Sequence, residues 1–267
     1  MTRPVEKSSR FWRHPDWPFE GRRAYDSAAC YRAHTHPTLS IGVIDHGSSL
    51  LTAGSRQVEL RVGDVVVIQP GEVHACNPLP SARWSYRMFY FDADWAKSIR
   101  AAGNVFGRPA FTLRSGEALG HLGEITRAVD DGKSTKETAT TVKRVLGELF
   151  QLANGPAASR LPRVSAATLR AQRYLEVHAD ERVDLAFLAR EVGLTPFQLI
   201  RRFKRDCGLT PHAYQLDRRV QRARELLRQP KPSLAEVAYS LGFADQSHFQ
   251  RVFKTRVAAT PAEYRGT

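Results

Sequence analysis

One sequence unit occurs twice in the last hundred residues of this chain. Leu185 and Leu234 begin equivalent segments and lie 49 positions apart, as do the glycines that end those segments. Arg201 and Arg251 lie 50 positions apart, so one residue is inserted ahead of the second cationic segment. A repeat of this period indicates that one supersecondary unit is used twice, which limits the folds open to the C-terminal part.

The first copy predicts two helices joined by a tight turn. Apolar residues recur at helical spacing from Leu185 to Val192, and Gly193 follows where a helix commonly ends in the left-handed conformation. Thr195 and Pro196 then provide an N-cap and a proline at the first helical position. Residues 184–206 therefore have the helix-turn-helix layout, whose second helix can enter a DNA major groove.

The second copy repeats this layout over residues 233–256. Ser233 and Glu236 form a capping-box pattern, Gly242 supplies the turn, and Asp245 can cap the helix that follows. The accessible face of that helix is rich in Gln and Arg, the side chains that read adenine and guanine edges. A basic helix with glutamine is often only a solvated surface, but two copies at one fixed period favour DNA binding.

The segment from about Val164 to Thr267 resembles the DNA-binding domain of the AraC/XylS family of bacterial transcription regulators. The residues that carry the resemblance are Leu241-Gly-Phe-Ala-Asp-Gln-Ser-His-Phe-Gln-Arg-Val-Phe-Lys254 and Thr260-Pro-Ala-Glu-Tyr-Arg265. The long connecting helix of that family fits Pro211 to Arg228, where one apolar stripe holds Leu216, Val220, Ala223 and Leu227. The resemblance implies that the two reading helices enter successive major-groove segments about 34 Å apart.

Carried over position by position, the resemblance separates base-reading from phosphate-binding residues. The base-reading positions correspond to Phe197, Ile200, Arg201, Gln246, Ser247, His248, Gln250 and Arg251. The cations assigned to phosphates, where charge gives affinity without sequence information, are Arg202, Lys204, Arg205, Lys254 and Arg256.

The chain departs from the family pattern in two places. Ile200 can contact a thymine methyl but cannot form a hydrogen bond. In the second copy Val257-Ala258-Ala259 replaces the glycine-containing turn Cys207-Gly208-Leu209 of the first. We therefore expect an asymmetric site in which the second motif reads its groove more strongly.

Net charge agrees with a polyanionic partner but does not locate it. The chain has a formal net charge of +13 and a sequence pI near 10.1. Residues 164–267 hold 18 Lys and Arg against 11 Asp and Glu, a net +7, which leaves +6 on the rest. Double-stranded promoter DNA is the partner that this charge and the motifs predict.

Composition also bears on the compartment. The N-terminus lacks the apolar run of a signal peptide, and no stretch approaches the roughly 20 apolar residues of a membrane span. Cys30, Cys76 and Cys207 are far apart, which suggests neither a disulfide framework nor a cysteine-rich metal knuckle. We expect a cytoplasmic protein with no membrane partner.

Residues 154–163 predict a linker, because they contain two prolines and a glycine without periodicity. We expect an effector-binding domain over 1–110, a helical region over 111–153 and the DNA-binding domain over 164–267. In the helical region an apolar stripe comprises Val142, Val145, Leu146, Leu149 and Ala153. The stripe could pair with a second copy to form a homodimer, or pack on its own domain.

Residues from about Gly21 to Asp94 predict β structure. Short apolar or alternating runs lie at 40–44, 49–51, 58–62, 65–68 and 86–91, separated by turn residues. Strands at this spacing favour a small barrel or jelly roll. The stretches from Arg32 to Pro37 and from Gly63 to Asn77 resemble the cupin sensor domain that precedes this DNA-binding module in the family. The whole chain is thus expected to be a two-domain α+β protein with an all-α C-terminal domain.

His34, His36 and His74 raise the question of a metal ion. His34 and His36 point to the same side of a strand and could converge with His74 inside a barrel. Metal-binding cupins add a carboxylate a few residues after the histidine pair, and residues 37–42 contain none. We therefore expect no metal and no cofactor, with the histidines bonded to the barrel or touching an effector.

A concave barrel mouth lined by apolar and a few polar groups is a general ligand site. The predicted effector-binding residues are Arg32, His34, His36, His74, Trp84, Tyr86 and Tyr90. The aromatic segment 11–19 could be a mobile arm over that site, or its tryptophans could close the end of the barrel.

These patterns predict a transcription regulator, not an enzyme, whose promoter binding is controlled by a small-molecule effector. Activation is the commoner outcome in the family, and a contact with RNA polymerase is compatible with it. The alternative is a metal-dependent cupin enzyme fused to a DNA-binding module. A DNA-alkyl-transfer repair protein, a third interpretation, would need a reactive cysteine cluster.

Overall fold

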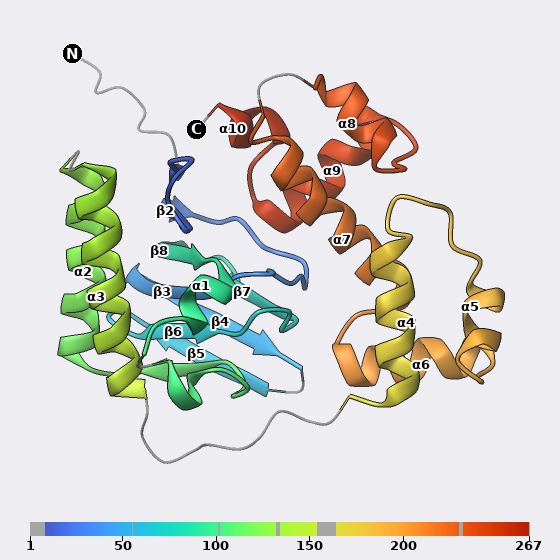
Figure 1. Cartoon of the computed structure of the whole chain (residues 1–267), viewed down its shortest axis with the longest axis horizontal. Helices are drawn as coiled ribbons and strands as arrows, with labels where there is room; N and C mark the ends of the chain where they lie inside the picture. Colours follow the sequence, from blue (N-terminus) through green and yellow to red (C-terminus); the bar gives the residue numbers. More distant parts are fainter. Residues whose placement is uncertain are drawn as a thin grey trace.

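The computed structural model describes residues 9–54, 56–100, 102–131, 134–153, 164–229 and 232–266. An N-terminal domain of two β-sheets and flanking helices lies beside a C-terminal domain built only of helices (Figure 1). The predicted linker 154–163 lies outside the described residues.

The N-terminal domain contains one sheet of six strands and one of three. In spatial order the larger sheet consists of β1 (Ser9–Trp12), β2 (Phe19–Ser27), β8 (Trp84–Phe91), β3 (Leu39–His46), β6 (Val65–Ile68) and β9 (Phe111–Leu113). The smaller sheet consists of β5 (Arg56–Arg61), β4 (Ser48–Ala53) and β7 (His74–Pro78). All pairings between neighbouring strands are antiparallel.

The larger sheet is buried on both faces. One face meets the smaller sheet through a core that includes Leu51, Ile68 and Trp84. The other face meets helices through a second core that includes Ile41 and Phe89. The strands therefore form two facing sheets with a jelly-roll character, and the sheet is not closed into a barrel.

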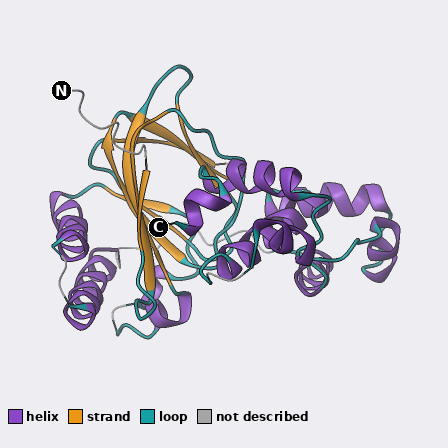
Figure 2. Ribbon diagram, turned by 90° about the horizontal axis from the view of Figure 1, so that it is seen from above, coloured by secondary structure: helices purple, strands orange, loops and turns teal. Residues whose placement is uncertain are grey.

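Helices α2 (Gly116–Asp130) and α3 (Thr135–Ala153) cover the outer face of the larger sheet, as Figure 2 shows from above. The predicted stripe of α3, from Val142 to Ala153, is buried in this core. The stripe thus packs on its own domain, which was the second of the two alternatives. The short helices α1 (Ala93–Lys97) and η1 (Gly103–Val105) contribute to the same core.

The aromatic N-terminal segment is part of the fold. Trp12 stacks on Phe89 with ring centroids 5.8 Å apart, and Trp17 stacks on Phe19 at 4.9 Å. Phe11 instead packs edge-on against Tyr264 of the C-terminal domain at 5.5 Å. The tryptophans therefore pack against the sheet. Strand β1, which contains Phe11 and Trp12, also reaches the other domain.

The C-terminal domain contains the two predicted motifs. Its helices are α4 (Ala166–Val177), α5 (Leu185–Glu191), α6 (Pro196–Cys207), α7 (Pro211–Leu226), α8 (Leu234–Ser240), α9 (Gln246–Val257) and α10 (Pro261–Arg265). Gly193 and Gly242 have φ angles of 72° and 69°, as the turn of each motif requires. The predicted caps Thr195, Ser233 and Asp245 each accept a backbone N–H of the following helix.

Helix α7 joins the two motifs and belongs to both. Its predicted stripe packs in the core of the second motif, and its Tyr214 packs in the core of the first. Arg219 of α7 donates to the carbonyls of Ala179 and Glu181, and also to that of Gly242 in the turn of the second motif. A Cβ at Gly242 would lie 1.9 Å from the Asp180 carbonyl oxygen, so only glycine fits where the motifs meet.

Candidate functional site

The second helix of each motif presents its predicted reading face to solvent. On α6, Leu199 and Phe203 are fully buried, whereas Phe197 is 73% exposed and Ile200 and Arg201 are also exposed. On α9, Phe249 and Phe253 are buried. The other predicted readers of α9 are exposed or half-buried, namely Gln246, Ser247, His248, Gln250 and Arg251.

Four of the five predicted phosphate-binding cations are accessible. Arg202 is half-buried, and Lys204, Arg205 and Lys254 are exposed. Arg256 is different, because it is 5% exposed and faces the N-terminal domain. Its assignment to phosphate is corrected here: α9 turns Arg256 away from its accessible face, and Asp217 lies 3.9 Å from its Nε.

A buried carboxylate of the N-terminal domain binds three arginines and a tyrosine. Glu20 on β2 forms ion pairs with Arg224 of α7, with Arg228 just beyond the end of α7 and with Arg13, and it accepts a hydrogen bond from Tyr264 of α10. Burial raises the pKa of the Glu20 carboxyl, but Arg224, Arg13 and Arg228 outweigh it and hold that pKa at about 2. Glu20 is therefore ionised at neutral pH and ties the two domains together.

The segment between β2 and β3 makes a second set of contacts with α7. Thr35 donates to Asp217 Oδ2 through its Oγ1 at 2.6 Å and its backbone N–H at 3.3 Å. Gln221 donates to the Thr35 carbonyl at 2.8 Å. Thr35 and Asp217 are fully buried, so this contact belongs to the interior of the protein.

A third contact reaches the C-terminal end of helix α9. The guanidinium of Arg22 on β2 donates to the carbonyls of Val257 and Ala258, at 3.1 Å in the second case. Cations are favoured at a helix C-terminus because unsatisfied carbonyls and the helix dipole concentrate negative charge there. Ala258 is left-handed at φ 50°, the conformation that Gly208 has at the end of α6.

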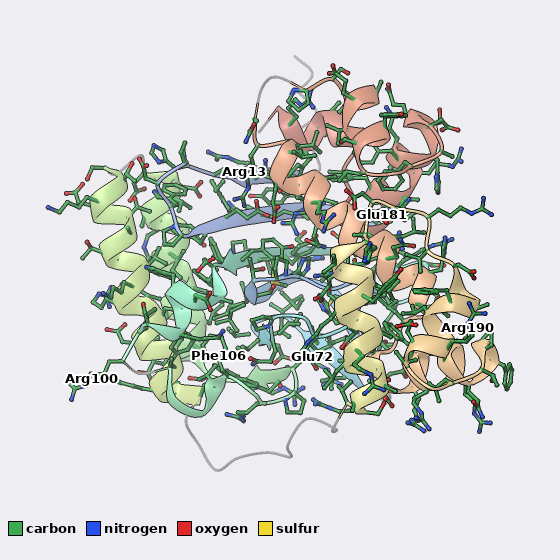
Figure 3. All side chains as sticks on the ribbon, turned by 45° about the vertical axis from the view of Figure 1, so that its right-hand side comes forward. Arg13, Glu72, Arg100, Phe106, Glu181 and Arg190 are labelled. Carbon is green, nitrogen blue, oxygen red and sulfur yellow. The ribbon has the colours of Figure 1, made fainter. Side chains whose placement is uncertain are left out.

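A small cavity lies between these contacts. It is lined by Phe11, Arg22, Tyr31, His34, His36 and Tyr90 of the N-terminal domain, and by Gln221, Arg224, Arg256 and Val257 of the C-terminal domain. Its volume of about 20 Å³ has room for roughly one water molecule. Arg22 Nε and Arg256 Nε are buried without a hydrogen-bond partner among the described residues. The two domains thus border a small space whose wall carries three arginines. Figure 3 labels Arg13 at this interface.

The seven predicted effector residues have three different surroundings. His34, His36 and Tyr90 line the cavity, and His74 lies directly behind the first two. Trp84 and Tyr86 pack between the two sheets, with ring centroids 4.2 Å apart. Arg32 is exposed, and its backbone N–H bonds to Thr255. Periodicity gave no sign of the lining residues from α7 and α9, because they belong to the other domain.

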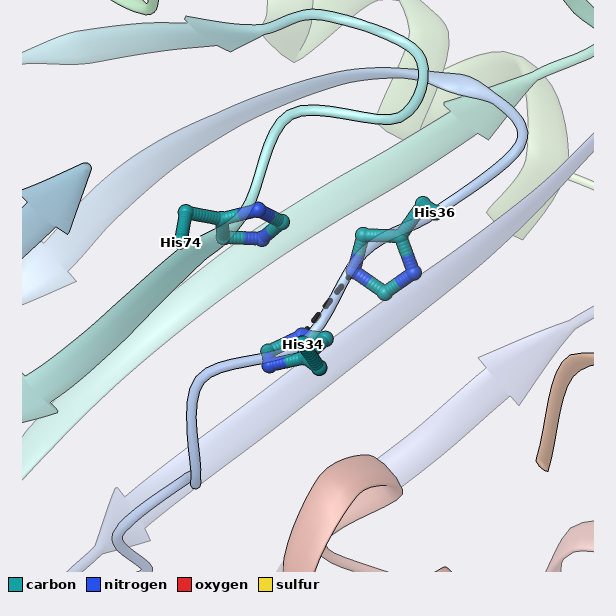
Figure 4. A group of neighbouring side chains, drawn as sticks. All are labelled: His34, His36 and His74. Carbon is teal, nitrogen blue, oxygen red and sulfur yellow. Dashed lines mark hydrogen bonds between the residues drawn. The ribbon is translucent and has the colours of Figure 1, made fainter. Parts of the chain in front are cut away.

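The three histidines form one buried cluster (Figure 4). His34 Nε2 lies 3.1 Å from His36 Nε2, and one nitrogen of each ring lies within 4.8 Å of those of the other two. Burial lowers the pKa of His34 to about 4 and that of His74 to about 3. It also lowers the pKa of His36, so all three rings are neutral at pH 7.

The cysteines do not resemble a reactive cluster. Cys76 is buried and Cys207 is half-buried, and burial raises the pKa of each thiol to about 12. A thiol with so high a pKa is a poor nucleophile at neutral pH. This geometry gives no support to an alkyl-transfer repair protein.

Comparison with known proteins agrees with the two-domain architecture. A model of the AraC-like ligand binding domain matches residues 16–158, which is more than half of the chain. The chain belongs to the AraC family of transcription regulators. A helix-turn-helix domain model matches residues 188–267 of this AraC-family protein, the part that contains α6 and α9.

Relatives from several bacteria align with most of this AraC-family chain. The arabinose operon regulatory protein of Escherichia coli strain K12 is 28% identical over 82% of this chain and 77% of its own length. The uncharacterized HTH-type transcriptional regulator YbfI of Bacillus subtilis strain 168 is 26% identical over 80% of each chain. ToxT from Vibrio cholerae strain SCE256 has a TM-score of 0.64 at 16% identity, over 95% of this chain and 99% of that one. The likeness to ToxT shows a shared fold.

No helix among the described residues is long and apolar enough to cross a membrane.

Proposed function

We propose that this AraC-family regulator reads promoter DNA with α6 and α9 and is controlled by an effector that acts at the interdomain cavity. The observation that supports this most directly is the composition of the cavity wall, which combines residues of β2 and the histidine segment with residues of α7 and α9. A ligand bound there would touch the sensor and the DNA-binding domain at once. Its differential affinity for two domain arrangements would shift DNA occupancy.

The effector that best fits this wall carries a carboxylate or a similar compact anion. Arg22, Arg224 and Arg256 line the cavity, and Arg22 and Arg256 each have a buried Nε without a hydrogen-bond partner among the described residues. Guanidinium groups bind carboxylates through parallel hydrogen bonds. A ToxT structure from Vibrio cholerae was solved with an unsaturated fatty acid bound. The cavity of about 20 Å³ holds no such molecule as it stands, so binding would separate the domains locally.

For DNA, we propose base contacts by Phe197, Ile200, Arg201, Gln246, Ser247, His248, Gln250 and Arg251. Phosphate contacts are assigned to Arg202, Lys204, Arg205 and Lys254. The second motif offers more hydrogen-bonding side chains on its exposed face, which supports unequal reading of the two grooves.

The test combines selection and screening with the full-length protein. Selection of bound sequences from a random DNA pool should recover an asymmetric site with stronger base preference in one half. Thermal-shift screening should then find small carboxylates that change the melting temperature, with the corresponding amides as matched controls. Footprinting of the selected site with and without each hit measures control. If neither acids nor amides alter melting or footprint, effector control at this cavity is wrong.

We further propose that the protein acts in the cytoplasm as a homodimer and that it contacts RNA polymerase. We propose that it is a binding protein and not an enzyme. The relatives named above are regulators, which supports a binding role. Because the apolar stripe of α3 is already buried, a dimer would have to use another surface. Sedimentation of the purified protein at several concentrations tests the dimer.

A further inference from the structure

The histidine cluster has the donor spacing of a metal site. Two nitrogens bound to one zinc-class ion at about 2.1 Å would lie roughly 3.0 to 3.4 Å apart. His34 Nε2 and His36 Nε2 are 3.1 Å apart, and His74 contributes a third nitrogen within 4.8 Å. All three rings are buried, so ordering them for a ligand costs little further entropy.

Hydrogen bonds on the far side of two rings orient their lone pairs toward the centre. His34 Nδ1 lies 2.8 Å from the carbonyl of Arg32, and His74 Nδ1 lies 2.9 Å from that of Glu72. A carbonyl only accepts, so each Nδ1 carries the proton and each Nε2 presents a lone pair. Backbone carbonyls commonly orient zinc-binding histidines in this way.

His36 has the opposite tautomer in this structure. Arg224 Nη1 lies 3.2 Å from His36 Nδ1, and a guanidinium only donates, so His36 Nδ1 accepts. The proton of the neutral ring is then on Nε2 and is directed to the lone pair of His34 Nε2. This arrangement satisfies His34 and His36 when no ion is bound.

We propose that the Nε2 atoms of His34, His36 and His74 bind one divalent ion of the zinc class, and that binding breaks the hydrogen bond from Arg224 to His36. Three neutral imidazoles suit zinc and its neighbours in the transition series. Metal at His36 Nε2 moves the ring proton to Nδ1, which then faces a second donor on Arg224. Metal binding and this interdomain hydrogen bond therefore exclude each other, so the ion weakens the hold of the N-terminal domain on α7.

The proposal does not depend on the nature of any organic effector, and it is an alternative to the expectation of no metal. Residues 37–42 still supply no carboxylate, so the described residues of this cluster offer three ligands and leave at least one coordination position to water or another small molecule. The nearby Arg224 charge opposes a divalent cation. This opposition predicts that the ion binds more tightly once Arg224 loses its charge.

The first experiment measures binding by the full-length protein. Zinc is added, excess is removed by gel filtration, and bound metal is counted; Co²⁺ serves as a coloured probe in a parallel sample. We expect one ion per chain, a raised melting temperature, and visible Co²⁺ absorption. His36→Gln and His74→Gln should each lose the ion, with circular dichroism confirming that the variants are folded. His121→Gln is the matched control, because His121, Glu124 and Glu148 form a second cluster of potential ligands on α2 and α3.

Each result of the zinc-binding experiment either supports the interior site or overturns it. Loss of the ion in His36→Gln and His74→Gln, with retention in His121→Gln, supports the site. Loss only in His121→Gln places the ion on the outer helices and overturns the proposal, as does folded wild-type protein that retains neither zinc nor Co²⁺. If the two interior variants do not fold, zinc competition against Co²⁺ in wild type and in His121→Gln decides the same question, because only binding at the interior site survives His121→Gln.

The second experiment tests the coupling to α7. Arg224→Met removes the donor to His36 and the opposing charge, and it should tighten zinc binding on the order of tenfold. Arg228→Met is the matched control, because Arg228 also pairs with Glu20 but has no contact with His36 among the described interactions. Equal zinc affinity in wild type and Arg224→Met would show that the hydrogen bond and the ion are independent, and would overturn the coupling.

Discussion

Arg22 on strand β2 donates a hydrogen bond to the carbonyl of Val257, the last residue of helix α9. A sensor-domain side chain thus takes the place of water or a local cap at the end of a DNA-binding helix. The same guanidinium lines the interdomain cavity. The orientation of α9 is therefore linked directly to the position of β2.

Replacing Arg22 tests this link. Arg22→Met keeps much of the packing volume but leaves the carbonyls of Val257 and Ala258 buried without their donor, at a cost of about 1 to 3 kcal/mol. We expect a lower free energy of unfolding and stronger DNA binding without effector, because α9 is released. Urea denaturation and a gel-shift titration measure the two effects. Arg23→Met is the matched control, since Arg23 faces Asp130 on α2 at 3.9 Å. A gel shift identical to wild type would count against the link.

The left-handed residue at the end of α9 predicts an easy gain in stability. Ala258 has a φ angle of 50°, which costs a residue with a Cβ roughly 1 kcal/mol relative to glycine. Ala258→Gly should raise the free energy of unfolding by about that amount. The reverse change at the equivalent position, Gly208→Ala, should lower it by at least as much, because the new Cβ would lie 3.1 Å from Val73. Calorimetry that gave Ala258→Gly a lower melting temperature would contradict this.

The buried Glu20 predicts an acid-sensitive interdomain interface. Its folded pKa of about 2 lies below the ordinary value of 4.5, so its stabilising effect is complete above pH 4.5 and is lost as pH falls toward 2. The shift corresponds to up to about 3 kcal/mol. The stability difference between wild type and Glu20→Gln, measured by urea denaturation, should shrink between pH 6 and pH 3. A difference that stayed constant over this range would show that Glu20 does not titrate as described.

Substitutions on α9 should separate reading from electrostatic affinity. Arg251→Ala is expected to cost about 1 to 3 kcal/mol on the preferred site and to relax specificity at one base pair. Lys254→Ala, one turn further along, should weaken all sequences alike and reduce the salt dependence by about one phosphate. Titrations of the selected and a scrambled site at several salt concentrations distinguish the two patterns. Equal losses on both sites in Arg251→Ala would move Arg251 to the phosphate group.

The repeat made the C-terminal domain predictable from sequence. Thr195, Ser233 and Asp245 act locally, through hydrogen bonds to backbone three residues away, so their pattern is visible in the sequence itself. Helical spacing likewise identified the buried stripe of the connecting helix, which includes Val220, Ala223 and Leu227. A short continuous apolar run also indicated β6, whereas β2, with charged residues buried by the other domain, had neither an apolar run nor alternation.

The interdomain interface could not be predicted in this way. Glu20 and Arg224 are 204 positions apart, and each occurs in a segment where a charge is expected to face solvent. Arg256 shows the same limit, because its place after the reading face of α9 suggested a phosphate contact while the fold turns it inward. Helical periodicity describes the faces of one helix and contains no information about which face a second domain will cover.

Helix α7 holds the two motifs at one fixed separation. Through Arg219 and the close approach at Gly242 it fixes their separation, and through Asp217 and Arg224 it also receives the N-terminal domain. An operator with one base pair inserted between the two contacted grooves would displace one of them by about 3.4 Å and rotate it by roughly a tenth of a turn. Two motifs held at a fixed separation by α7 cannot adjust to that displacement. The spacing between half-sites, as much as the bases within them, should therefore decide which promoters this regulator recognises.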